Sequence, residues 1–509
     1  MRLHPQPRPS ATPFANLIRI AERGLPFTAA DGRAFFRIAA PSSGGFLIFP
    51  LRSLSFRNWF FANYFGDYSS FPTNHDFRAV LHHLEAQANA DPNHQRLAVW
   101  QRVGSRGPSC LPSQLLLDLA NPEGQFVEIS PGGWKVAAGE NALLETYRAT
   151  GQLPEPLQHS ESPAAALEML RPCLNLESRA DWLRCLAWLV SALRPVGPQS
   201  FLVLQGPAGS GKTLAARILR SLIDPAAAPF APLPQNPRQL LALARHHWIL
   251  AFDQVSTLSP ALSDAFCRLA TGAGAIVTEV APADPTRDPL IQHYRRPVLF
   301  TVTSRWEPSP EFARRSLTLH LPPFAGGRLQ SERSILQRFS EAYPYVIGAL
   351  CSALATALQR VSNIELSGTV RHPDVLIWAL AAAPALGCTE SEIEEALAVA
   401  PPQPRLVQAI DALVGLGRHW SGTPTALLKL LPPDVCRAAN ALSRALGRSQ
   451  PDLAAAGIRV NFHSKHRGQV VIDLDRLAGD DLCKTPAGLS SPQAGPQTEH
   501  VENMEPAAA

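Results

Sequence analysis

The chain has 509 residues, of which 46% are hydrophobic and 17% charged, and its formal net charge is +4. Its length gives roughly two to four globular domains, and the small net charge does not by itself indicate nucleic acid. No apolar run reaches the length of a membrane span, no signal-peptide pattern opens the chain, and the eight cysteines form no C-x-x-C pair. We therefore expect a cytoplasmic protein with reduced thiols, no cysteine-based metal site and no membrane partner.

The first part of the chain predicts a small α+β domain over residues 14–150. Residues 1–13 are rich in proline and are predicted to be disordered. Two apolar runs from Phe35, separated by Pro-Ser-Ser-Gly-Gly, predict a β-hairpin. Helices are expected from Ser55 and over 76–90. Further strands are expected over 97–103, 114–119, 126–129 and 134–136.

A proline-containing linker then leads into a series of further segments. Apolar residues recur at helical spacing in the lead-in, most clearly around Asp181. The expected order is a helical lead-in (155–195), a core domain (196–325), a helical domain (326–404), a C-terminal domain (405–476) and a disordered tail (477–509).

The most informative motif lies at the start of the core domain expected over 196–325. An apolar strand over 201–204 runs into a Walker A sequence and then into a helical run over 214–222. Backbone N–H groups of such a loop bind phosphate, Lys212 reaches the β- and γ-phosphates, and Thr213 offers its hydroxyl to Mg²⁺. The predicted ATP-binding residues are Gly206, Pro207, Ala208, Gly209, Ser210, Gly211, Lys212 and Thr213.

A second motif predicts the acid of the site. The apolar stretch 247–252 ends in Asp253, which fits a Walker B carboxylate that holds Mg²⁺ together with Thr213. Gln254 follows, where many ATPases of this type have a glutamate. An amide cannot accept the proton of the attacking water but can orient the water, so we predict slow hydrolysis. The alternative is a nucleotide-dependent switch that barely turns over.

Two later residues are candidates for contacting the γ-phosphate of ATP, one as a sensor and one as an arginine finger. Thr301 lies near the end of an apolar strand, where P-loop ATPases sense the γ-phosphate. Arg315 precedes a further strand and fits an arginine finger supplied across a subunit boundary; a surface arginine pair is the alternative. Between them, 272–296 predicts a hairpin whose turn carries Arg287. That turn either contacts a DNA phosphate in a central channel or is an ordinary exposed turn.

The C-terminal part predicts a winged helix, because helices precede two strands that flank a basic turn. Between residues 437 and 467, six lysines and arginines stand against one aspartate. Such a face binds phosphates, and a protein-interaction winged helix is the alternative. The candidate DNA-binding residues of this part are Arg444, Arg459, Lys465 and Arg467.

The order of these motifs resembles that of AAA+ P-loop ATPases of phages and mobile elements. Those ATPases are similar to superfamily 3 helicases and to the helicase part of primase–helicases. The resemblance extends over about residues 30–475 and is carried by GPAGSGKT, ILAFDQ, RRPVLFTVT and ARRSLTLHLPP. By this resemblance Lys212 and Thr213 bind phosphate and Mg²⁺, Asp253 is the Walker B acid and Arg315 is the finger. Relatives more often have asparagine where this chain has Gln254 and Thr301, which again implies weak turnover.

These observations together predict an α/β P-loop core with an N-terminal α+β domain and a C-terminal winged helix. The expected function is that of an ATP- and Mg²⁺-dependent DNA motor or remodeller of a phage or mobile element. It would form a homo-oligomeric ring, with single-stranded DNA in the ring and duplex DNA at the winged helix. The alternative is a non-motor, ATP-gated assembly or loader protein. A nucleotide-sensing defence protein would need an effector domain, which the sequence does not show.

Overall fold

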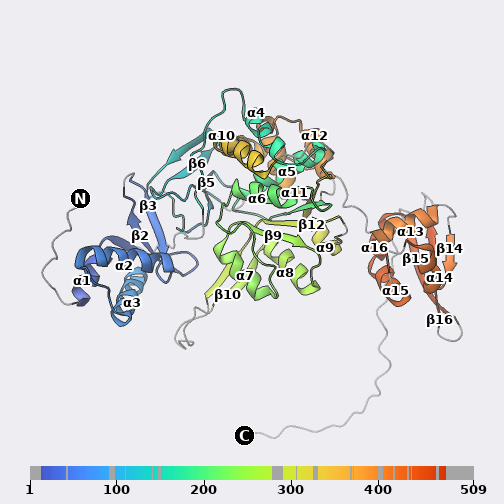
Figure 1. Cartoon of the computed structure of the whole chain (residues 1–509), viewed down its shortest axis with the longest axis horizontal. Coiled ribbons are helices and arrows are strands. Elements are labelled where there is room, and N and C mark those ends of the chain that lie inside the picture. Colours follow the sequence, from blue (N-terminus) through green and yellow to red (C-terminus); the bar gives the residue numbers. More distant parts are fainter. Residues whose placement is uncertain are drawn as a thin grey trace, which may run out of the picture. The chain divides into compact units, whose positions relative to one another are not determined.

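The structure is a computed structural model of the chain, shown in Figure 1. It describes residues 13–41, 44–90, 98–108, 111–139, 142–146, 151–277, 290–304, 306–324, 331–366, 370, 372–398, 405–415, 419–432, 435–436, 438–465 and 469–476. The chain divides into two compact units, Met1–Pro401 and Pro402–Ala509, and each is described by itself. The tail predicted over 477–509 and the first twelve residues lie outside the described residues, and a helix already begins at Pro13.

The N-terminal part of the first unit packs helices against a three-stranded antiparallel sheet. Its elements are α1 (Pro13–Ala21), β1 (Gly24–Thr28), β2 (Ala34–Ala39), β3 (Phe46–Pro50), α2 (Leu54–Tyr68) and α3 (Asn74–Ala90). The pairing of β2 with β3 confirms the predicted hairpin. Ser53 caps α2 by accepting the N–H of Phe56 at 3.0 Å. Phe56, Phe60 and Phe77 are buried where α2 and α3 meet.

A four-stranded antiparallel sheet follows, with the strands in chain order. Its strands are β4 (Val103–Arg106), β5 (Gln114–Asp118), β6 (Phe126–Ser130) and β7 (Gly133–Ala137). The strand expected over 97–103 is wrong, because Arg102 has a φ of 60° and this left-handed backbone interrupts an extended strand. The sheet packs against a later helix, where Trp134 Nε1 donates to Ser352 Oγ at 2.9 Å.

The centre of the first unit is a four-stranded parallel sheet in the order β13-β8-β12-β9. Its strands are β8 (Phe201–Gly206), β9 (Leu250–Val255), β12 (Val298–Thr303) and β13 (Ser316–His320), which confirms the strands expected at these positions. The helices that follow them are α6 (Lys212–Ser221), α7 (Pro237–His246), α8 (Pro260–Thr271) and α9 (Pro310–Arg314). Figure 1 shows α6 on one face of the sheet and α7 and α8 on the other. Because the strands are parallel, their carboxyl ends meet at one edge.

An antiparallel hairpin stands between α8 and β12, as the sequence predicts. It consists of β10 (Ala273–Val277) and β11 (Leu290–Tyr294). Its turn, which includes Arg287, lies outside the described residues.

The helices before and after the parallel sheet share one apolar core. They are α4 (Pro163–Glu168), η1 (Arg171–Cys173), α5 (Arg179–Ala192), α10 (Glu332–Arg360), η2 (Val361–Asn363), α11 (Pro373–Leu386) and α12 (Glu390–Ala398). Both α4 and α5 pack against α10 and α11. By length and composition alone, the stretch Glu332–Asn363 is apolar enough to cross a membrane, contrary to the expectation of no such segment. In the structure 67% of its apolar window is buried inside the first unit, where it forms the centre of the helix bundle.

The second unit is a small α/β unit with a three-stranded antiparallel sheet in the order β14-β16-β15. Its elements are α13 (Arg405–Gly415), β14 (His419–Gly422), α14 (Pro424–Leu430), α15 (Ala439–Arg448), α16 (Gln450–Ala455), β15 (Ile458–Lys465) and β16 (Gln469–Arg476). The stretch 419–422 forms a strand, and Thr423 caps α14 by accepting the N–H of Ala426 at 3.2 Å. Leu442 and Leu446 of α15 pack against Ile472 and Leu474 of β16 in one core.

Candidate functional site

The Walker A residues form the loop between β8 and α6, at the carboxyl edge of the parallel sheet. Gly209 and Gly211 have φ values of +77° and +83°, which favour glycine. A Cβ on Gly206 would lie 2.4 Å from the carbonyl oxygen of Leu321, so the loop passes too close to β13 for a side chain there. Gly211 caps α6 without a side-chain hydrogen bond, so no side chain of the cap residue covers the start of this helix. Such a helix start is an anion-binding feature.

Lys212 folds back over the loop that carries it. Its Nζ donates to the carbonyl oxygens of Gly206 at 2.9 Å and Pro207 at 2.5 Å, and lies 3.4 Å from Ser210 Oγ. Partial burial lowers the pKa of Lys212, and the nearby Asp253 carboxylate opposes this shift. The ammonium group therefore satisfies its hydrogen-bonding capacity within the loop itself.

The structure brings Thr213 and Asp253 together across the edge of the sheet. Thr213 Oγ1 lies 3.0 Å from Asp253 Oδ1 and 3.2 Å from Oδ2, although the two residues are 40 positions apart in the sequence. A carboxylate and a threonine hydroxyl are oxygen donors of the kind that Mg²⁺ prefers. This pair is consequently a chemically suitable place for the predicted metal.

Thr301 is buried next to Asp253 and is not exposed at the Walker A loop. Its side chain is fully buried, and its hydroxyl donates to Asp253 Oδ1 at 2.5 Å. Thr301 Oγ1 also accepts the backbone N–H of Gln254 at 2.8 Å. The described hydrogen bonds of this side chain therefore all go to the Walker B segment, which makes Thr301 a residue that positions Asp253. Its predicted role as a γ-phosphate sensor stays a prediction.

Gln254 occupies a strained position at a β-bulge. The register of β9 against β12 shifts between Phe300 and Val302, so that Asp253 and Gln254 together lie opposite Thr301. Gln254 has a φ of 55°, in the left-handed region that residues other than glycine seldom adopt, and its side chain is exposed. Bulges and such backbone strain often re-aim a side chain at a functional site. At the bulge Gln254 is an extra residue in β9, so its side chain does not follow the regular alternation of the strand after Asp253.

Two residues near the loop were missed by the sequence analysis. Asn175 Nδ2 donates to the carbonyl oxygens of Ser210 at 3.2 Å and Pro322 at 2.7 Å, and so links the loop to the segment after β13. A Cβ on Gly211 would lie 3.2 Å from the ring of Phe324, which places that ring against the loop. No motif marks Asn175, because its partners are backbone atoms from distant segments.

The remaining predicted residues lie outside this cluster. Arg315 follows α9, and its guanidinium pairs with Glu311 at 2.8 Å; no described contact joins it to Lys212 or Asp253. In the second unit, Arg444 of α15 and Arg459 of β15 are exposed. The predicted DNA contacts whose side chains lie outside the described residues are Arg287, Lys465 and Arg467.

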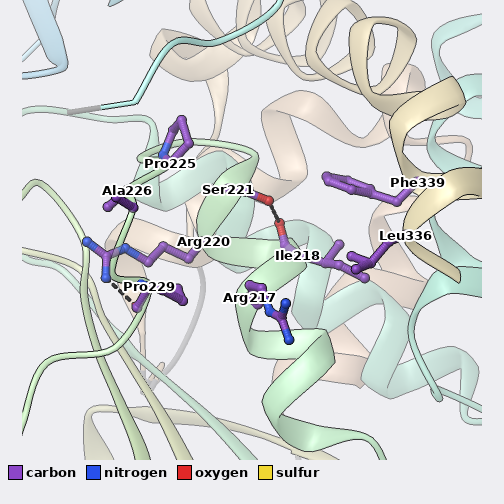
Figure 2. A pocket seen from close by; sticks show the side chains of 10 residues that line it. Arg217, Ile218, Arg220, Ser221, Pro225, Ala226, Pro229, Leu336 and Phe339 are labelled. Carbon is purple, nitrogen blue, oxygen red and sulfur yellow. Dashed lines mark hydrogen bonds between the residues drawn. The ribbon is translucent and has the colours of Figure 1, made fainter. Parts of the chain in front are cut away.

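A separate cavity of about 260 Å³ lies beside α6, facing the start of α10 (Figure 2). Its lining residues are Arg217, Ile218, Arg220, Ser221, Pro225, Ala226, Ala227, Pro229, Leu336 and Phe339. No residue of the Walker A loop lines it. Arg220 is already bonded there, since its guanidinium donates to the carbonyl oxygens of Asp224 and Pro229. This cavity is therefore distinct from the expected phosphate site.

Two of the solved structures that resemble this chain show low sequence identity to it. The apo C-terminal region of NrS-1 is 9% identical, with 92% of this chain and 100% of that chain covered and a TM-score of 0.35. A JCV helicase with a bound acetamide compound is 13% identical, with 51% of this chain and 74% of that chain covered and a TM-score of 0.23. Both TM-scores are below 0.5, so no conclusion is drawn from either. Among curated proteins no match is found.

Two stretches of the sequence match known protein families. Residues 168–391 match the replication protein of actinomycete integrative conjugative elements, AICE RepA. Residues 406–487 match the C-terminal domain of the same RepA. Both models describe one kind of replication protein, so over these two stretches the chain is similar to RepA of actinomycete integrative conjugative elements.

Proposed function

We propose that this chain is an ATP-binding, slowly ATP-hydrolysing DNA motor or remodeller that acts in the replication of an integrative element. One observation carries the proposal. The hydroxyl of Thr213 and the carboxylate of Asp253 lie 3.0 Å apart at the end of a Walker A loop, although they come from segments far apart in the sequence. A shared edge of a parallel sheet is where α/β proteins place their ligands.

The residues at this edge fit ATP and Mg²⁺. In the proposed site Thr213 and Asp253 hold the metal, while Lys212 and the backbone N–H groups at the start of α6 bind the phosphates. When bound, Mg²⁺ neutralises the charge of the phosphates, and ATP supplies the bond that is hydrolysed. Lys212 must exchange its hydrogen bonds to the carbonyl oxygens of Gly206 and Pro207 for bonds to phosphate.

Slow turnover is proposed because Gln254 follows the Walker B acid where many ATPases of this type have a glutamate. Gln254 can orient a water molecule by its amide but cannot take up a proton from it, so it supplies positioning without general-base catalysis. General-base catalysis typically contributes about 10²–10⁴-fold to a rate. Thr301 keeps Asp253 and the backbone of Gln254 in a fixed arrangement. We therefore infer a site organised for hydrolysis but lacking its usual base.

The second unit is the proposed duplex-binding part. Its order of helix, strand, three helices and two antiparallel strands supports a winged helix, in which α15 would enter the major groove. Arg444 and Arg448 are exposed on α15, and Arg459 is exposed on β15. Lys465, the last residue of β15, and Arg467, which lies outside the described residues, are proposed phosphate contacts. A winged helix that binds another protein is the alternative.

A homo-oligomeric ring is proposed from the position of Arg315. Within one chain, Arg315 pairs with Glu311 and makes no described contact with its own Walker residues. An arginine finger supplied to the site of a neighbouring subunit has this property, and it would exchange Glu311 for the transferred phosphate. In such a ring Arg287, on the turn between β10 and β11, is the proposed contact to single-stranded DNA in the channel.

A second candidate function is an ATP-gated assembly or loader protein that uses binding rather than turnover. The exposed Gln254 with its strained backbone favours this candidate, because the usual base is absent. The two candidates differ in one measurable property. A motor hydrolyses ATP faster when DNA is present, whereas a loader changes its assembly state on ATP binding alone.

The test is steady-state ATP hydrolysis with and without single-stranded DNA, with Lys212→Ala as the blank. We expect a slow rate that DNA stimulates and that Lys212→Ala abolishes. Tight ATP binding without turnover above the blank would favour the loader function and contradict the motor function. Absence of ATP binding by the wild type, measured by equilibrium dialysis, would overturn both.

A further inference from the structure

The helices of the N-terminal part carry exposed aromatic rings in line with arginines. On α2, Arg57, Phe61 and Phe65 recur every four residues and so share one face of the helix. Phe71 follows α2 in the segment that leads to α3. Phe65 is 48% exposed and Phe71 is 66% exposed. Large exposed aromatic side chains next to one another are uncommon on a monomer and mark a binding surface.

The geometry of this surface is fixed by contacts within it. The rings of Phe65 and Phe71 stack, with 4.9 Å between centroids and 19° between planes. The Arg57 guanidinium lies 5.0 Å from the centroid of the Phe61 ring and donates to Asn74 Oδ1 at 3.1 Å. Phe61 in turn packs edge-on against Phe77 of α3 at 5.0 Å. The rings and the arginine are therefore held in place before any ligand arrives.

The charge of the surface is positive. Arg78 lies one helical turn after Asn74 on α3 and is exposed. The nearest acidic residues of these helices, Asp67 and Asp76, stand two positions from Phe65 and Asn74 and therefore point to other sides. Asp67 pairs with Arg23, and Asp76 accepts the hydroxyl of Thr73 at 2.8 Å. The described residues of this face thus combine arginine, asparagine and aromatic rings without an acid.

We propose that this surface, the aromatic–arginine stripe (Arg57, Phe61, Phe65, Phe71 and Arg78), binds unpaired bases of single-stranded DNA. A base presents a flat π face on which Phe71 can stack, and Arg57 and Arg78 attract the phosphates on either side. Bases within a duplex stack on one another and do not offer these faces. The choice of DNA as the strand rests on the proposed function; the stacking chemistry rests on the stripe alone.

Binding of bases to the stripe can be distinguished experimentally from docking of a protein partner. Base stacking needs an aromatic ring, whereas a protein partner that buries an apolar side chain accepts an aliphatic one. The matched series is therefore Phe71→Ala, Phe71→Leu and Phe71→Tyr in the full-length chain. Phe71 is largely exposed, so these changes leave the fold intact, which a thermal unfolding curve for each variant checks.

The experiment measures the dissociation constant for a fluorescent oligo(dT) by anisotropy. Stacking contributes about 1–3 kcal/mol per base, so Phe71→Ala should weaken binding roughly tenfold, and Phe65→Ala with Phe71→Ala still more. Phe71→Tyr should stay within about twofold of the wild type, and Phe71→Leu should resemble Phe71→Ala. Equal affinity of the leucine variant and the wild type, or no wild-type affinity for oligo(dT), would overturn the proposal.

The stripe and the proposed motor can fail separately. DNA-independent ATP hydrolysis and duplex binding should be unchanged in the Phe71 variants, because neither uses the stripe. If Phe71→Ala weakens oligo(dT) binding while the wild type hydrolyses no ATP, the proposed DNA binding by the stripe is supported and the proposed motor function is contradicted. If the wild type hydrolyses ATP but oligo(dT) binding is the same in all variants, the proposed DNA binding by the stripe is contradicted and the proposed motor function is not.

Discussion

Thr301 Oγ1 lies 2.5 Å from Asp253 Oδ1 and also accepts the backbone N–H of Gln254 at 2.8 Å. One buried hydroxyl thereby fixes the carboxylate proposed to hold Mg²⁺ and the residue proposed to orient water. The bulge in β9 makes this possible, since both residues lie opposite Thr301. The relationship gives Thr301 a defined role that needs no direct contact with nucleotide.

We expect Thr301→Val to lower kcat for ATP roughly tenfold, because a hydrogen bond to a charged group typically contributes about 1.5–3 kcal/mol. Thr301→Ser keeps the hydroxyl and should retain most of the rate. The measurement is steady-state hydrolysis over a Mg²⁺ titration, in which the valine variant should also need more Mg²⁺. Equal rates for the valine variant and the wild type would show that Asp253 does not depend on Thr301.

Gln254→Glu is expected to raise the steady-state rate, because a carboxylate can accept the proton of the attacking water and an amide cannot. The Lys212→Ala,Gln254→Glu double variant serves as the control and should be inactive. An unchanged rate in Gln254→Glu would mean that this position does not limit the chemistry.

Asn175→Ala should raise KM for ATP by up to about thirtyfold, since two hydrogen bonds that hold the loop are lost and each contributes about 1 kcal/mol. The contacts concerned join Asn175 to Ser210 and Pro322. Asn363→Ala is the matched control, because Asn363 is exposed in η2 and away from the loop. If kcat falls and KM does not change, the loop is held by other contacts.

Stability should fall as the pH drops below about 6.5. Burial and the neighbouring Arg220 lower the pKa of His247, whose Nδ1 lies 3.2 Å from an Arg220 nitrogen and must be neutral to accept from it. The unfolded chain therefore binds the proton more readily, and the stabilisation present above pH 6.5 is lost as the pH falls towards the folded pKa.

The size of this pH effect can be isolated by one substitution. In His247→Asn an amide oxygen can accept from Arg220 without titrating. Between pH 7.5 and 5.5, urea unfolding should lose up to about 1 kcal/mol more in the wild type than in His247→Asn. The same pH dependence in both proteins would assign the loss to other groups.

Arg444→Gln with Arg448→Gln should weaken binding to duplex DNA and reduce the slope of log K against log salt by roughly two. Both side chains are exposed on α15. Replacing the same residues by lysine keeps the charge and should keep the slope. A slope that is unchanged in the glutamine variant would favour a winged helix that binds protein.

Local pattern was sufficient for most elements of the fold. The strand–loop–helix over 201–222, the strands ending near Asp253 and Thr301, and the hairpin of β10 and β11 are all as predicted, because each is encoded by a short apolar run with its own turn signals. The glycine pattern likewise predicts the positive φ of Gly209 and Gly211, since phosphate loops need such backbone. Strand β14 was not predicted, because its four residues carry too little alternation of apolar and polar side chains to indicate a strand.

The sequence by itself determined which residues are candidates for the chemistry, Lys212, Thr213 and Asp253 among them, since their motif depends on neighbours in the chain. Only the tertiary structure decided that Thr301 positions Asp253, that Asn175 holds the loop, and that β4 begins only after Arg102. These facts depend on contacts between segments far apart in the sequence and on one left-handed backbone angle. No local pattern encodes such contacts, because the packing of the parallel sheet and the helix bundle brings these segments together.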